Sequence, residues 1–308
     1  MLNSVKHHKL IDVRFYYFNF IQYFCTMFKN MINSDLKTGF IFLLGVALLA
    51  SCSQYEKVLK SPDLEWKYDK AMEYYEDEQF VRSATLFEQL IPYTRGAQRS
   101  DSINFFHAMS YYKQQDYIMA EHYFKEFTRQ FPKNKFAEEA EYLHAYCNYL
   151  MSPRPSLDQS NTYAAIEAFQ LFMIKYPRSE KVPDALKLIE SMRNKLVEKS
   201  FMSARLYFDL EDYKASIVAL QNSLNEFPNT KHREEIMFLI LKSSYLLAQN
   251  SVVEKQKERY QNTLDEYYSF IAEFPESEYL NEVQAIHQST TDFLGVDPTD
   301  SNQMNAEK

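Results

Sequence analysis

Five stretches of the chain alternate apolar and polar residues with the spacing of amphipathic helices, and each ends at an apolar residue followed by proline. The prolines recur at intervals of 40 to 51 residues, at Pro92, Pro132, Pro177, Pro228 and Pro275. Proline lacks the backbone N–H that would continue a helix. Such a period is the signature of a helical repeat. We therefore predict an all-α fold of about five helix pairs between residues 62 and 275, without β-sheet.

Two of these stretches match each other at interior positions. Aligned on their prolines, residues 108–132 and 204–228 coincide at Ala108/Ala204, Tyr111/Tyr207, Tyr112/Phe208, Asp116/Asp212, Tyr117/Tyr213, Ala120/Ser216 and Phe124/Leu220. Residues 71–92 fit the pattern with a shorter second helix. Two further units carry insertions before the second helix, at 152–161 and 249–258. One helix pair cannot bury its apolar face alone, so we expect neighbouring pairs to stack into a solenoid.

These units resemble tetratricopeptide repeats. The resemblance rests on a small residue and aromatics in the first helix, Asp before Tyr at the turn, a small residue and an aromatic in the second helix, and then Pro. It implies antiparallel helix pairs with a concave groove. Candidate groove residues that could bind a peptide are Tyr74, Tyr75, Tyr111 and Tyr112. Core packing is the favoured interpretation of these four, because they also occupy repeat-packing positions.

The N-terminal part of the chain reads as a presequence, residues 1–51. An apolar run of eleven residues, 40–50, follows Lys37 and leads into Leu49-Ala50-Ser51-Cys52. Eleven residues are too few to span a bilayer, which needs about 20, and the arrangement is typical of a secretory signal. The last four residues resemble the bacterial lipobox. We therefore predict cleavage before Cys52 and lipidation of its thiol.

Residues 1–30 are unusual for a signal of this kind, which normally starts a few residues before its apolar run. Met31 would provide such a start. We expect residues 1–30 to come from an upstream start codon chosen in error. The alternative is an extra membrane-seeking segment, because residues 11–28 are rich in aromatic and apolar side chains. Polar side chains such as Asp12 and Arg14 interrupt that segment and are costly in lipid.

Charge and composition exclude several classes of function. The 308 residues carry a net charge of −8, and residues 1–51 hold five basic and two acidic side chains. The remaining 257 residues therefore hold 29 basic and 40 acidic groups, a net charge of −11. An acidic chain lacks the electrostatic attraction to phosphate that nucleic-acid binding requires. Only four glycines are present, which disfavours the glycine-rich loops of nucleotide-binding folds.

The side chains that carry chemistry show no catalytic pattern. Cys25 lies in the presequence and Cys52 would be lipidated, so Cys147 has no partner for an intrachain disulfide. We expect Cys147 to be a small core residue rather than a catalytic thiol. The five histidines beyond the presequence show no metal-binding HExxH spacing: His107, His122, His144, His232 and His287. We predict a protein that is not an enzyme and has neither a metal site nor a cofactor.

A lipobox followed directly by five such repeats is similar to the BamD family of outer-membrane β-barrel assembly lipoproteins. The similar text lies at residues 53–90, 131–150 and 183–217. The resemblance implies a lipid-anchor linker at 52–61, a solenoid at 62–291 and, with the composition, a polar disordered tail at 292–308. It also implies that the protein is located on the periplasmic face of the outer membrane. The implied partners are a BamA-like barrel insertase, other assembly lipoproteins and unfolded barrel precursors.

By the same resemblance, the first repeats (about 62–177) hold an extended precursor segment and the last repeats (about 204–291) dock the insertase. Two other functions stay open at this point. One is a periplasmic tetratricopeptide adaptor in envelope or cell-division maintenance. The other is a glycan-capturing helical-repeat lipoprotein, which would need exposed Trp platforms, although Trp66 is the only Trp of the chain.

Overall fold

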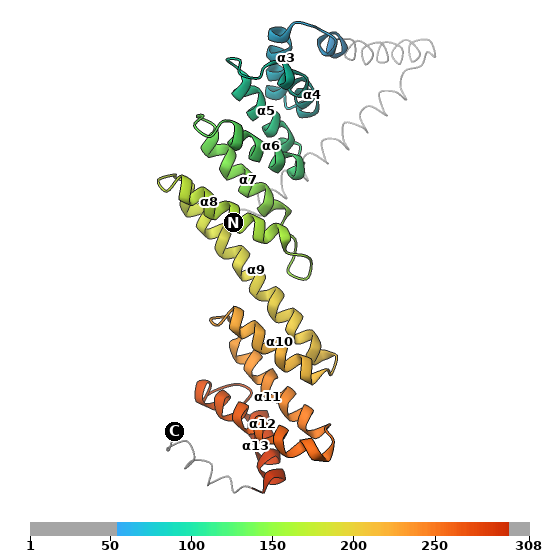
Figure 1. Cartoon of the computed structure of the whole chain (residues 1–308), viewed down its shortest axis with the longest axis vertical. Coiled ribbons are helices and arrows are strands. Elements are labelled where there is room, and N and C mark those ends of the chain that lie inside the picture. Colours follow the sequence, from blue (N-terminus) through green and yellow to red (C-terminus); the bar gives the residue numbers. More distant parts are fainter. Residues whose placement is uncertain (1–53, 296–308) are drawn as a thin grey trace, which may run out of the picture. The chain divides into compact units, whose positions relative to one another are not determined.

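The computed structural model describes residues 54–295, in which every regular element is a helix (Figure 1). This confirms the all-α prediction for the part of the chain described. The chain divides within one helix, between Ile103 and Asn104, into two compact units, here called unit 1 and unit 2. A short helix at residues 54–59 comes first in the described chain. The helices that follow are α3 (Leu64–Glu76), α4 (Phe80–Leu90), the 3-10 turn η1 (Ile91–Tyr93), α5 (Ser100–Lys113), α6 (Tyr117–Gln130), α7 (Ala137–Met151), α8 (Ser160–Lys175), α9 (Val182–Asp209), α10 (Tyr213–Glu226), α11 (Arg233–Gln249), α12 (Val253–Glu273) and α13 (Leu280–Leu294).

These helices form the five expected pairs, α3/α4, α5/α6, α7/α8, α9/α10 and α11/α12, and α13 follows as an additional helix. The turns inside three of the pairs share one backbone device. Each contains a residue in the left-handed region: Glu78 (φ 59°), Gln115 (φ 64°) and Glu211 (φ 61°). Around Gln115, its N–H donates to the carbonyl of Tyr112 and the N–H of Asp116 donates to the carbonyl of Tyr111, both at 3.0 Å. These two hydrogen bonds satisfy carbonyl groups in the last turn of the first helix.

The second helix of most pairs ends at the aromatic residue that precedes proline, as the sequence predicts. The N–H of Phe131 donates to the carbonyl of Phe127 at 2.8 Å, and the two rings lie 5.2 Å apart. The same arrangement recurs for Tyr176 on Phe172 (5.7 Å) and for Phe274 on Phe270 (5.6 Å). In the first pair, α4 ends at Leu90 and Pro92 lies in η1.

A ring stack joins consecutive repeats of unit 2. The residue just before a first helix packs face to face on an aromatic of the preceding first helix. The stacked pairs have ring centroids 4.2–4.3 Å apart: Phe136 on Phe105, His232 on Phe201 and Tyr279 on Phe238. At the equivalent joint between α7 and α9, the ammonium of Lys181 lies 4.7 Å from the ring centre of Tyr142.

Helix α9 is 28 residues long and belongs to two apolar cores within unit 2. Its first half gives Ala185, Ile189 and Met192 to a core that begins at Phe105. Its second half starts with Phe201 in another core, which extends to α13. A single continuous helix therefore joins the two cores of this unit.

The two insertions expected before second helices differ in structure. Residues 152–159 form a non-helical loop held by buried Gln159, whose side-chain amide donates to the carbonyls of Arg154 and Leu157 at 2.9 and 3.0 Å. The other expected insertion, 249–258, is mostly helical, because α12 already begins at Val253. It lengthens the second helix rather than forming a loop.

Candidate binding surfaces

The first two candidate tyrosines, Tyr74 and Tyr75, lie on α3 in unit 1. Tyr74 is 9% exposed and meets the ring of Tyr55 edge-on at 5.7 Å. The guanidinium of Arg82 lies 5.7 Å from the ring centre of Tyr74. Tyr75 is half-buried with its edge against Phe80 at 5.5 Å, and burial raises the pKa of its hydroxyl. Both rings therefore pack inside unit 1.

The other two candidates, Tyr111 and Tyr112, lie on α5 in unit 2 and are half-buried. Tyr111 stacks on Tyr123 with ring centroids at 5.3 Å. Tyr112 contacts Tyr117 at 6.0 Å and Phe124 at 6.4 Å, and burial raises its pKa to about 12. All four tyrosines thus lie in helix contacts, as expected of packing residues. Their participation in a ligand groove stays a prediction.

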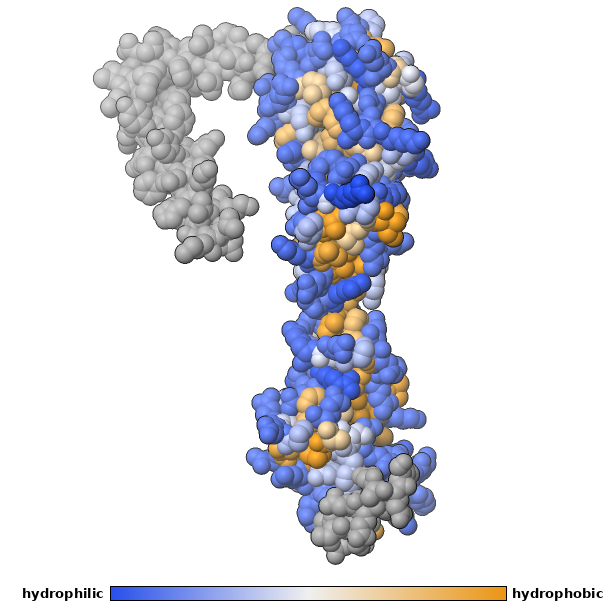
Figure 2. All heavy atoms as spheres, turned by 90° about the vertical axis from the view of Figure 1, so that its left-hand side faces the viewer, coloured by the Kyte–Doolittle hydropathy of each residue, from blue (hydrophilic) through white to orange (hydrophobic). Residues whose placement is uncertain are grey.

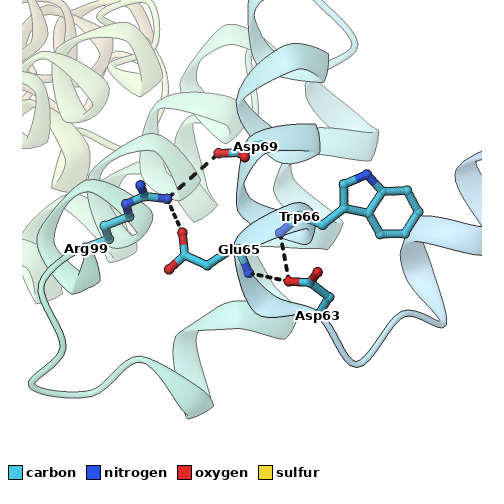
Figure 3. A network of polar contacts seen from close by, with 5 residues as sticks. All are labelled: Asp63, Glu65, Trp66, Asp69 and Arg99. Carbon is cyan, nitrogen blue, oxygen red and sulfur yellow. Dashed lines mark hydrogen bonds and ion pairs between the residues drawn. The ribbon is translucent and has the colours of Figure 1, made fainter.

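A polar network covers one side of α3 in unit 1 (Figure 3). Arg99 donates to Glu65 at 2.5 Å and lies 3.8 Å from Asp69. The carboxylate of Asp63 caps the helix by accepting the N–H groups of Glu65 and Trp66, both at 3.1 Å. The indole of Trp66 points away from the network and is 37% exposed. It is a single aromatic surface rather than the set of platforms that a glycan site needs.

Exposed apolar side chains gather on α8 and α9 in unit 2. Figure 2 shows apolar residues exposed among hydrophilic ones on one face of the molecule. Three exposed apolar residues follow one another at four-residue spacing along the second half of α9 and its C-cap, namely Met202, Leu206 (54% exposed) and the C-cap residue Leu210 (67%), here called the α9 stripe. Residues four apart lie on the same side of a helix. The stripe is therefore a continuous apolar surface that no helix within residues 54–295 covers.

Sequence reasoning missed the α9 stripe, although a signal was present. Residues 201–210 read FMSARLYFDL, with apolar side chains all round the helix. Phe201 and Ala204 are buried in the core, whereas Met202 and Leu206 face solvent. A helix that packs on one side needs only one apolar face, so the excess indicates a second contact surface.

A polar pocket of about 300 Å³ lies between α10, α11 and α12. Burial, and then the nearby charge of Asp265, raises the pKa of the Glu266 carboxyl above its usual range. The guanidinium of Arg259 donates to the carbonyl of Leu247 at 3.5 Å and to the hydroxyl of Ser251. With carboxyl, guanidinium and amide groups in its wall, the pocket suits a polar side chain of a partner. It is lined by Ile217, Gln221, Ser244, Leu247, Arg259, Asn262, Asp265 and Glu266.

Two of the side chains that could carry chemistry, Cys147 and His107, are buried. Cys147 has no exposed surface, which confirms its place in the core, and burial raises its pKa to about 12. Burial lowers the pKa of His107 to about 4, and neither ring nitrogen has a hydrogen-bond partner. Across residues 54–295, no three His, Cys, Asp or Glu side chains are grouped to hold a metal. The same residues contain no helix long and apolar enough to span a bilayer. The predicted lipidation site, Cys52, lies outside the described residues.

Comparison with known proteins gives a family match over most of the folded chain. A family model named YfiO and described as outer membrane lipoprotein matches residues 63–259. The outer membrane protein assembly factor BamD of Vibrio cholerae is 22% identical over 230 residues, which cover 70% of this chain and 94% of that protein. BamD of Rickettsia prowazekii is 20% identical over 188 residues, 61% of this chain and 75% of that protein. A protein of Aquifex aeolicus with a provisional form of the same name is 23% identical over 226 residues, 73% of each chain.

Among solved structures, a complex of the TPR2AB domain of yeast Sti1 with pHSP90 aligns over 74% of this chain and 98% of that chain. The TM-score is 0.34 and the sequence identity 11%. A similarity at this level does not establish a common fold, so the fold is assigned from the helix pairs described above.

Proposed function

The chain belongs to the YfiO family of outer membrane lipoproteins, and from that premise we propose that it is a non-catalytic, lipid-anchored component of β-barrel assembly. Its relatives are named for outer membrane protein assembly, which supports a role for this chain in the same process. In this proposal, Cys52 carries the lipid and the folded chain lies on the periplasmic face of the outer membrane. The protein binds unfolded barrel precursors, a BamA-like insertase and other assembly lipoproteins.

The observation that carries the proposal is the extent of the family match. It begins at Asp63, the N-cap of α3, continues through the first four helix pairs and α11, and ends at Arg259 in the first part of α12. The packing agrees with a binding role, because stacked helix pairs offer extended surfaces to protein partners. The α9 stripe and the polar pocket between α10, α11 and α12 are two such surfaces.

The two cores of unit 2 support a division of labour, in which repeats up to α8 hold precursors and repeats from α9 on dock the insertase. Separating the protein near residue 180 would remove Ala185, Ile189 and Met192 from the first core. The proposal is therefore better tested by point variants in the full chain than by halves. Leu206 and Leu210 on the α9 stripe suit this purpose, because their exposure leaves both cores intact.

Partner capture from detergent-solubilised envelope tests the function. Recovery of a β-barrel insertase supports the proposal. Recovery of murein synthases without an insertase would instead indicate the adaptor in envelope maintenance. The variant Cys52→Ala should release a soluble protein or leave an uncleaved precursor, because the acyl chains on the mature N-terminal cysteine provide stable anchoring. Cys147→Ala is the matched control, since that thiol is buried and its loss should leave the attachment unchanged.

The paired variant Leu206→Lys/Leu210→Lys tests the insertase surface. We expect it to lose binding to the soluble domains of the insertase and to keep binding of a barrel C-terminal peptide. Ile174→Lys on α8 is the control, because Ile174 is 77% exposed and lies outside the stripe. The division of labour would be contradicted if the stripe variant and Ile174→Lys lost insertase binding equally. It would also be contradicted if the stripe variant alone lost binding of the barrel peptide.

A further inference from the structure

The described chain begins with a short helix, residues 54–59, that lies along α3. At its end, the carbonyl of Leu59 accepts the ammonium of Lys67, in the first turn of α3, at 3.2 Å. At its start, the ring of Tyr55 meets Tyr74, near the end of α3, at 5.7 Å. The short helix therefore runs antiparallel to α3, and Gln54 lies next to the turn between α3 and α4.

This segment is fixed to unit 1 by packing. Val58 has no exposed surface. The guanidinium of Arg82, at the start of α4, lies 5.3 Å from the ring centre of Tyr55 and 5.7 Å from that of Tyr74. Cation–π contacts of this kind are attractive, and more so where the groups are shielded from water. The stretch expected to be a linker thus belongs to the fold from Gln54 onward.

The number of residues between Cys52 and this helix limits the distance between a lipid on Cys52 and the surface of unit 1. Cys52 precedes Gln54 by two residues, and two residues span about 7 Å at most. An acyl group on Cys52 therefore emerges close to the turn at 77–79 and to the first residues of α4. The other end of the α3/α4 pair, which carries η1, lies about one helix length away.

We propose that the turn at 77–79 and the start of α4 form the surface of unit 1 that faces the phospholipid bilayer. The inference rests on the proposed lipidation of Cys52 and adds an orientation to it. Glu76, Asp77 and Glu78 repel anionic headgroups. The contact is therefore apposition to the headgroup surface and not insertion into the hydrocarbon.

Two residues with similar exposed fractions mark the opposite ends of this helix pair. Val81 is 66% exposed beside the turn, and Tyr93 is 73% exposed in η1. They are separated by about 20 Å along α4 and η1.

The experiment uses the full acylated protein in vesicles of phosphatidylethanolamine and phosphatidylglycerol. A fluorophore is attached at Val81→Cys or Tyr93→Cys, and the vesicles carry nitroxide-labelled headgroups. Buried Cys147 does not compete for the label.

We expect headgroup quenching at position 81 to exceed that at position 93 by about twofold or more, because the two sites differ by most of a helix length. A flexible Gly-Ser insertion of about ten residues between Ser53 and Gln54 should abolish the difference, since it frees the lipid from the short helix. Val58→Asp, which breaks the packing of that helix, should act in the same direction.

Equal quenching at the two positions in the acylated parent protein would overturn the orientation and leave the proposed function standing. Persistence of the difference after the Gly-Ser insertion would also overturn it, because the fixed attachment would then not be its cause. Mass spectrometry of the parent distinguishes the remaining case. A protein without lipid on Cys52 would contradict the proposed anchoring itself, and the inference would fail with it.

Discussion

Truncation of Phe136 to Ala should weaken the joint between the second and third helix pairs. The Phe136 ring stacks on Phe105 with centroids 4.3 Å apart and an interplanar angle of 8°, and it meets Phe106 edge-on at 6.1 Å. Complete burial makes a Phe→Ala change cost about 3–5 kcal/mol. Phe136 is half-buried, so we expect a loss of about 2 kcal/mol in the free energy of unfolding, to which the stack itself contributes about 0.5–1.5 kcal/mol.

A double-mutant cycle isolates the contribution of the stack. Phe105→Ala, Phe136→Ala and the double variant are unfolded in urea and followed by circular dichroism. We expect a coupling energy of about 0.5–1.5 kcal/mol. Tyr163→Ala is the control, because this exposed ring on α8 should contribute within about 0.5 kcal/mol. If the effects of the two single changes add to within about 0.3 kcal/mol, the stack does not stabilise the joint and the reasoning fails.

Three further outcomes test the backbone and the buried side chains. Glu211→Gly should raise the free energy of unfolding by about 1 kcal/mol because φ is 61° there, whereas Asp209→Gly in helical α9 should lower it by a similar amount. Burial lowers the pKa of His107 to about 4, so between pH 6.5 and 4 this imidazole binds a proton in the unfolded chain but not in the folded one. The free energy of unfolding should therefore decrease by up to about 3 kcal/mol as the pH is lowered through this range. His107→Gln should remove that part of the fall and exposed His122→Gln should not, as acid titrations of unfolding would show. Cys147, with its pKa raised to about 12, should resist a thiol reagent at pH 8 until urea unfolds the chain.

The helix pairs could be predicted because each pair is marked locally. An apolar residue before Pro132 or Pro228 ends a second helix, and Asp116 and Asp212 cap the helices that follow the turns. These signals act within a few residues of chain, where propensity and capping decide the structure. The number and order of the pairs follow from them.

Features that depend on contacts between repeats could not be predicted. The stack of His232 on Phe201 joins residues 31 positions apart, while Tyr279 and Phe238 are 41 apart, so no constant spacing reveals it. The five predicted helix pairs stop at Pro275, so helix α13 lies beyond them, although it falls mostly within the predicted solenoid at 62–291. Its end at Leu294 lies past the predicted start of the tail at residue 292. Val283 and Ile286 of this helix are buried in the second core.

For the candidate surfaces, the sequence leaves packing and binding roles indistinguishable. Tyr111 and Tyr112 occupy positions where an aromatic ring can fill the space between helices or line a groove. The structure shows their ring contacts with Tyr123 and Phe124. The α9 stripe is the opposite case, because Leu206 looks like a core residue in the sequence and is exposed in the fold.

The uninterrupted course of α9 sets an angular relation between the two cores it serves. Each residue added to a helix advances it by 1.5 Å and turns it by about 100°. One residue inserted between Met192 and Phe201 would thus rotate the second core by about a quarter turn relative to the first and misdirect the α9 stripe. Seven inserted residues would restore the direction to within about 20° and lengthen the helix by about 10 Å. The spacing between the two cores can therefore change only in steps of whole helical turns.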